Sequence, residues 1–245
     1  MTVRFRPSLV LTIATAALFL LLVSLGVWQL ERLKWKLQLI ETVGSHLAAK
    51  PVSLDQALRR GADAQYRRVT LYGRFENGKE AYVFATDDAG APVYHVIVPF
   101  ITGRGALLVD RGIVLPMLLN QRTRTAGVVR GPAQITGVWR TPDPPGFFTP
   151  APDKVHRVWY ARDVASIAKA DRVTLLAPVL VEADSQPNAG GWPKGGQTRV
   201  VFRNEHLQYA MTWFALAAGL IGVYLAYHVS TGRLRFRSAS PDPRS

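Results

Sequence analysis

The chain has 245 residues, of which 48% are hydrophobic, and its formal net charge at pH 7 is +13. It contains no cysteine, which excludes a disulfide scaffold, a thiol oxidoreductase, covalent haem attachment through a C-x-x-C-H motif and a thiolate copper site. Such a positive charge would suggest a nucleic-acid partner for a soluble protein, but two apolar segments point to a membrane, so we expect no nucleic-acid partner.

Two segments are long enough to cross a membrane. Residues 8–30 and 207–229 each contain 23 residues without Asp, Glu, Lys or Arg. At about 1.5 Å per residue each spans a hydrocarbon core of about 30 Å, so we predict two transmembrane helices. The first stays compatible with a helix to about Glu41. A cleaved signal peptide is the alternative for the first segment, since Arg4 and Arg6 precede it, but its apolar run is longer than a signal core.

Basic residues set the expected orientation. Arginines precede the first span, and the tail, residues 230–245, carries four more, so the positive-inside rule places both termini in the cytoplasm. Basic residues just after the first span argue the other way, but a long segment is translocated largely regardless of its charge. With no Arg- and Ser-rich presequence, we expect a bacterial inner membrane and a periplasmic domain over residues 31–206.

That domain is large enough for one hydrophobic core and carries 24 Lys and Arg against 16 Asp and Glu, a net charge of +8. Anionic lipid, an acidic protein face or an anionic cofactor are therefore the expected partners.

Several local signals predict the elements of this domain. A capping box over Ser53–Gln56 predicts a short helix that ends at Gly61. The clearest hairpin is expected over residues 66–84, where two alternating runs meet at Asn77-Gly78, a favoured two-residue turn.

After a second hairpin and another strand comes a proline-rich loop, and Asp163 is expected to cap a short helix reaching Ala170. These patterns predict one antiparallel, β-rich α+β domain between two transmembrane helices. The further predicted strands cover residues 93–101, 106–114, 133–140 and 174–182.

Catalytic patterns are absent from the sequence. There is no G-x-S-x-G elbow and no Walker loop, and the five histidines form none of the close pairs expected of a zinc or copper site. Asp110 and Arg111 are adjacent on a predicted strand, where a salt link is the expected role. We therefore expect a protein that is not an enzyme.

The head of the second span gathers polar and aromatic side chains. On a helix, His206, Tyr209 or Ala210, and Trp213 share one face. Small residues follow in two pairs four apart, Ala215 with Gly219 and Ala218 with Gly222, and they allow close packing against another helix. His228, at the other end, is expected to be an anchor at the headgroup level.

The first span ends in a matching stripe formed by Trp28, Arg32 and either Trp35 or Lys36. A two-helix hairpin can bring the stripes together, and they offer an imidazole, flat aromatic surfaces and cations. That inventory suits a haem, with His206 as the axial ligand of its iron and the cations pairing with its propionates. An interfacial aromatic belt is the alternative reading, but it does not explain His206.

Several blocks of the sequence closely resemble, in order, those of the surfeit-one family, over nearly the whole chain from Gly26 to about Ala217. One block, "LLVDRGIV", has Asp110 where family members often have asparagine. The blocks are "GVWQLERLKWKLQLI", "YRRVTLYGRFENGKE", "LLVDRGIV", "RTPDPPGFFTP", "WYARDV" and "GGQTRVVFRNEHLQYAMTWFALA".

The resemblance implies an assembly factor for haem-copper cytochrome c oxidase. Its implied partners are the catalytic subunit of the oxidase, membrane lipid and, as a further candidate, haem a synthase. In bacterial members it implies haem a bound by a histidine at the head of the second span, here His206. A scaffold that steadies an oxidase subunit without binding haem is the alternative. The other positions carried over are Gly26, Trp28, Gln29, Arg32, Trp35, Lys36 and residues 195–199.

Overall fold

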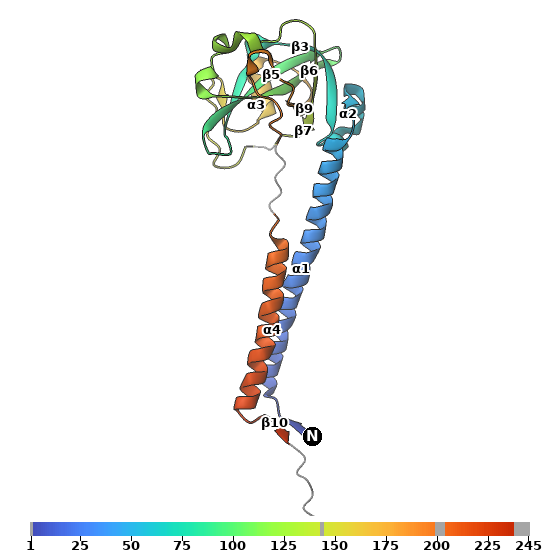
Figure 1. The fold of residues 1–245 in the computed structure, drawn as a ribbon, viewed down its shortest axis with the longest axis vertical. Coiled ribbons are helices and arrows are strands. Elements are labelled where there is room, and N and C mark those ends of the chain that lie inside the picture. The colour runs from blue at the N-terminus through green and yellow to red at the C-terminus, as the bar shows by residue number, and fades with distance from the viewer. Residues whose placement is uncertain (1, 143–144, 199–203, 238–245) are drawn as a thin grey trace, which may run out of the picture. The chain divides into compact units, whose positions relative to one another are not determined.

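The computed structural model describes residues 2–142, 145–198 and 204–237. The chain divides into two compact units, residues 1–42 with 201–245 and residues 43–200. Two helices long and apolar enough to cross a membrane therefore flank a β-rich central domain, which confirms the predicted fold class (Figure 1).

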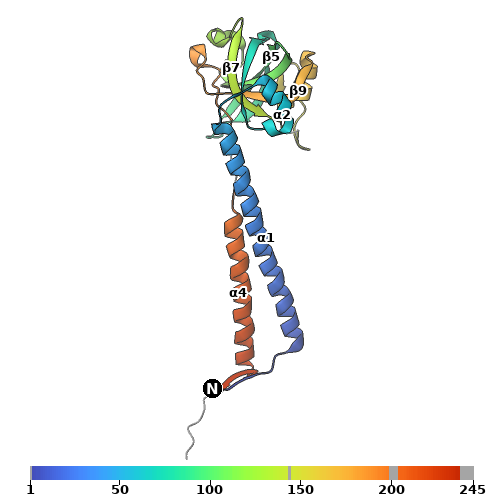
Figure 2. The ribbon, with the colours of Figure 1, turned by 90° about the vertical axis from the view of Figure 1, so that its right-hand side faces the viewer.

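Two long helices form the first unit, and both views show them side by side (Figures 1 and 2). α1 (Leu9–Ala48) has 40 residues, about 60 Å at 1.5 Å per residue, and α4 (His206–Ser230) has 25. α1 thus continues past its predicted end near Glu41. A two-stranded antiparallel ribbon between β1 (Thr2–Phe5) and β10 (Leu234–Arg237), which was not predicted, pairs the flanking segments.

Five strands of the second unit close into a barrel. β3 (Arg68–Phe75) pairs with β7 along its first six residues and with β5 along its last three. The ring runs from β3 through β7, β9, β6 and β5 back to β3, and the β6–β9 pair is its only parallel ladder. The other barrel strands are β5 (Pro92–Thr102), β6 (Gly105–Val114), β7 (Ala133–Arg140) and β9 (Leu175–Ala183).

Apolar side chains from the barrel strands form its core. Leu71, Phe100 and Leu107 are fully buried in one cluster, because alternate residues of a strand point to the same face. At Gly73, where β3 leaves β7 for β5, a Cβ atom would lie 2.1 Å from the Ile101 carbonyl oxygen. Only glycine allows the two strands to meet there.

The predicted hairpin over residues 66–84 is wrong. β3 and β4 (Ala81–Thr86) do not pair with each other, because both pair with β5. They follow one another along the same edge of that strand, joined by a 3₁₀ turn at Asn77–Lys79. The Asn77 side chain donates to the Val129 carbonyl at 2.8 Å, so the Asn-Gly pair anchors a bend rather than a two-residue hairpin turn.

Other local predictions are confirmed. The capping box of Ser53 and Gln56 opens α2 (Leu54–Arg60), and Asp163 caps α3 (Val164–Asp171) by accepting from the Ser166 amide at 2.9 Å. β5 and β6 form the second predicted hairpin. The remaining elements are β2 (Val52–Ser53), β8 (Val158–Trp159) and the 3₁₀ turns Gly61–Ala64, Pro116–Leu118, Gln121–Gly127 and Ala189–Gly191.

Candidate functional site

A hydrogen bond joins the head of α4 to α1. His206 Nδ1 lies 2.8 Å from Gln29 Oε1, and since an amide oxygen can only accept, Nδ1 carries the proton and donates. In the neutral imidazole the lone pair is then on Nε2, which has no hydrogen-bond partner among the described residues. A polar side chain that fixes one imidazole nitrogen and leaves the other as an acceptor is the usual arrangement of a metal-binding histidine.

Close packing below this bond fixes the two helices. A Cβ atom at Gly26 would lie 2.6 Å from the Phe214 ring, so the ring occupies the space that glycine leaves. Ala210 and Ala217 of α4 are buried on the same face. The predicted small-residue pairs do not face α1, since Gly219 and Gly222 have nothing within 4 Å of a Cβ position.

The other predicted site residues are only partly brought together. The Arg32 guanidinium carbon lies 4.0 Å from the centre of the Trp35 ring, so these two residues of the predicted stripe on α1 are in contact. Trp28 and Tyr209 are 54% and 52% exposed. Within the described parts of the chain, the side chains of Tyr209 and Lys36 have no hydrogen bond or ring contact with the rest of the predicted site.

The residues present at this level have the chemistry that a haem requires. His206 offers Nε2 as an iron ligand, and the exposed Trp28 and Trp35 offer flat apolar surfaces. Trp213 Nε1 is buried and lacks a hydrogen-bond partner among the described residues. A buried donor without an acceptor is costly, so this indole also fits a site completed by a bound group.

His228, at the opposite end of α4, is a structural residue. It is fully buried against the rings of Phe5, Tyr224 and Tyr227, and its predicted place at the headgroup level stays a prediction. Nδ1 donates to the Tyr224 carbonyl at 2.9 Å, and Nε2 accepts from the Ser8 amide at 3.5 Å.

Asp110 of the barrel finds the partner that sequence reasoning could not name. Its Oδ2 atom lies 2.7 Å from His95 Nδ1, and its Oδ1 atom accepts from the Gly112 amide at 2.8 Å. Burial alone would raise the pKa of Asp110, but His95, Arg162 and the Gly112 amide together lower it below 3.8. The predicted salt link therefore exists at Asp110, whereas Arg111 has none among the described residues.

A second buried charge pair lies in the same domain. Arg124 Nη2 donates to Glu80 Oε2 at 2.5 Å, and the exposed fractions of the two side chains are 2% and 5%. The Tyr82 hydroxyl donates to the same Glu80 oxygen at 3.0 Å. Burial, followed by the Glu80 charge, raises the pKa of Tyr82 to about 12. The ion pair was not predicted, because Arg124 lies 44 residues after Glu80 in the sequence.

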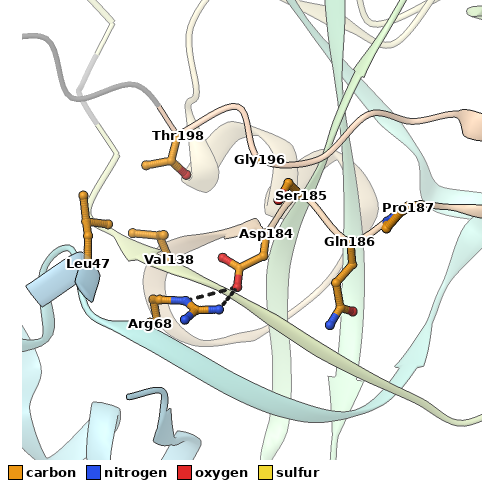
Figure 3. A pocket seen from close by; sticks show the side chains of 9 residues that line it. All are labelled: Leu47, Arg68, Val138, Asp184, Ser185, Gln186, Pro187, Gly196 and Thr198. Carbon is orange, nitrogen blue, oxygen red and sulfur yellow. Dashed lines mark hydrogen bonds and ion pairs between the residues drawn. The ribbon is translucent and has the colours of Figure 1, made fainter. Parts of the chain in front are cut away.

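An open groove of about 600 Å³ lies in the barrel domain (Figure 3). Arg68 and Asp184 form an ion pair in it, and the two side chains point toward one another. Gly196 and Thr198, from the glycine-rich approach to the second span, also line this groove. Arg199, which the resemblance carried over with them, lies outside the described residues.

Fold and site together define a class of membrane protein. A closed five-stranded barrel is joined to two membrane-length helices, and a histidine at the head of the second helix is hydrogen-bonded to a glutamine of the first.

A model of the SURF1 family matches residues 16–218, so the chain belongs to that family, a family of cytochrome c oxidase assembly factors. Surfeit locus protein 1 of Mus musculus is 35% identical over 226 residues, covering 82% of this chain and 71% of the mouse protein. The Takifugu rubripes protein of the same name is 33% identical over 230 residues, covering 85% and 95%. The Homo sapiens protein is 34% identical over 215 residues, covering 80% and 70%. The resemblance found in the sequence blocks is confirmed.

Proposed function

We propose that this protein binds haem a at the head of the helix pair and assists its insertion into the catalytic subunit of a haem-copper oxidase. The hydrogen bond from His206 Nδ1 to Gln29 is the observation that supports this most directly. It orients the ring, selects the tautomer and leaves Nε2 available as a ligand.

Each residue then has a defined part. A bound haem would supply an iron that takes an imidazole nitrogen as a ligand, and His206 would be the residue that holds it. Gln29 holds the His206 ring in place, and Trp28 and Trp35 cover apolar surface. Arg32 and Lys36 would neutralise propionates, with Arg32 already ordered by its stacking on Trp35.

The proposed partners are the oxidase catalytic subunit, haem a synthase and membrane lipid. We place the protein in a bacterial inner membrane, with both termini in the cytoplasm and the barrel in the periplasm. The chain has no cysteine, so single cysteines introduced at Asp87 and Thr231 can be labelled without background. A membrane-impermeant maleimide added to intact spheroplasts should label the first and not the second.

A colourless scaffold is the competing function. The exposed small residues Gly219 and Gly222 leave room for a helix of another protein, which would suit a scaffold that steadies an oxidase intermediate.

The test is an optical spectrum of the detergent-purified protein, coexpressed with a haem a synthesis pathway. We expect a Soret band in the wild type, its loss or shift in His206→Ala, and about 10- to 100-fold weaker binding in Gln29→Ala. His228→Ala is the matched control, because this histidine is buried at the other end of α4 and should leave the band unchanged. A colourless wild type would favour the scaffold.

A further inference from the structure

Arg111, on β6, carries a buried charge without a charged partner. Its residue is 3% exposed, and Nη2 donates to the Gly127 carbonyl at 2.8 Å and to Asn188 Oδ1 at 3.1 Å. The guanidinium carbon lies 4.7 Å from the centre of the Phe75 ring. All of these partners are neutral. Nη1 is buried and has no hydrogen-bond partner among the described residues.

Arg124 is the buried arginine of this domain with which Arg111 can be compared, because its charge is balanced by a carboxylate. Arg124 is paired with Glu80, whereas no carboxylate lies within 4.0 Å of Arg111 in the described part of the chain. Burial lowers the pKa of Arg111, and the nearby charge of Arg124 lowers it further against the opposing effect of Glu80. An uncompensated buried charge is costly unless an anion reaches it.

A cavity of about 170 Å³ lies against this side chain. Phe75, Val129, Ala133 and Ile135 give it apolar walls, and Arg111 with Asn188 supplies polar groups. Asp184 also lines it, but that carboxylate is bound to Arg68. The cavity therefore combines a positively charged side chain with an apolar lining.

We propose that this cavity binds a small organic carboxylate, with its carboxylate on the Arg111 guanidinium and its short apolar chain against Phe75 and Ile135. A guanidinium has donors in a planar fork that matches a carboxylate, and Arg111 lines this cavity while its own hydrogen bonds go to neutral groups only. A porphyrin is too large for 170 Å³, so this site is separate from the one proposed for haem and does not depend on it.

The experiment follows thermal unfolding of the full chain in detergent with sodium butyrate. Butyramide is the neutral control of equal shape, and sodium chloride controls for ionic strength. We expect a saturable rise in the unfolding midpoint with butyrate, and no such rise with butyramide or sodium chloride. A terminally blocked peptide with one Glu side chain forms a second arm. If this peptide raises the unfolding midpoint, whether or not butyrate also raises it, the bound carboxylate is assigned to a polypeptide partner.

Two variants test the assignment to Arg111. Arg111→Met should weaken the butyrate response at least about tenfold, since hydrogen bonds to a charged group contribute that much or more. Ala133→Leu fills the cavity while keeping the guanidinium, and it should abolish the response even if the first variant folds poorly. Equal shifts with butyramide, an unchanged response in Ala133→Leu, or no response to either carboxylate would overturn the proposal.

Discussion

The helix pair and the barrel bury polar groups in different ways. Contacts between α1 and α4 use neutral groups, such as His206 with Gln29 and Thr12 with Tyr224, whose hydroxyls lie 2.7 Å apart. The barrel instead buries ionised side chains in pairs, such as Arg124 with Glu80. Charges are expensive in hydrocarbon, so a membrane helix pair gains specificity from neutral bonds and small residues, whereas a globular domain such as the barrel can use ion pairs.

Breaking a buried ion pair should produce the largest effect. We expect Arg124→Met to lower the free energy of unfolding of the barrel by about 3–5 kcal/mol, because it leaves the Glu80 carboxylate buried and unpaired. Urea unfolding followed by tryptophan fluorescence measures this loss. Arg111→Met is the matched control and should cost far less without ligand, since it removes a charge that has no charged partner. Similar losses of unfolding free energy in the two variants would contradict the expected difference between a paired and an unpaired buried arginine.

Acid should weaken the barrel through Asp110, which faces His95, Arg162 and, across the Arg162 guanidinium, Glu182. Because folding lowers its pKa, its ionised form stabilises the fold above about pH 3.8, and this stability is lost as the pH falls through the lower folded value.

Asp110→Asn should remove this part of the acid sensitivity at a cost of about 1.5–3 kcal/mol near neutral pH, where charged hydrogen bonds are lost. Unfolding measured from pH 6 to pH 2 gives both quantities. A variant with the same acid-induced loss as the wild type would assign that loss to other carboxylates.

Steric change at the helix contact should have a smaller effect. Gly26→Leu must displace the Phe214 ring, and we expect a loss of about 1–3 kcal/mol in helix-pair stability, measured by SDS titration with circular dichroism. Gly219→Leu has open space around it and should cost much less. If both variants behaved alike, Gly26 would not be a packing contact.

Removing one neutral hydrogen bond should have the smallest effect. Tyr224→Phe deletes the contact with Thr12, and polar contacts between membrane helices average about 0.6 kcal/mol. The same SDS titration measures the change. A loss as large as that of Gly26→Leu would mean that this bond, rather than close packing, holds the pair.

Local sequence signals predicted local structure well. The capping box at Ser53 and the cap at Asp163 depend only on residues three apart, and both formed as expected. The hairpin at Asn77 failed because β5, more than ten residues later, offers its edge to both β3 and β4. A favourable turn sequence cannot reveal such a competing long-range pairing.

The candidate sites divide in the same way. His206 could be found because it stands out at the head of an apolar helix. A salt link at Asp110 was predicted without its partner, whereas the pair of Arg124 with Glu80 and the unpaired state of Arg111 were not predicted. Whether a charged side chain points into a barrel, and at what partner, depends on strand order and register across the whole domain.

The meeting of β3 with β5 has a consequence for how the barrel forms. Only three residue pairs close the ring there, whereas β5 and β6 share eight. A ladder of only three pairs gains little on its own, so the seam is expected to close after the longer and more local β5–β6 hairpin in folding and to open before it in the native state. Gly73 is therefore a kinetic control point, where the barrel becomes a closed ring or reverts to an open sheet.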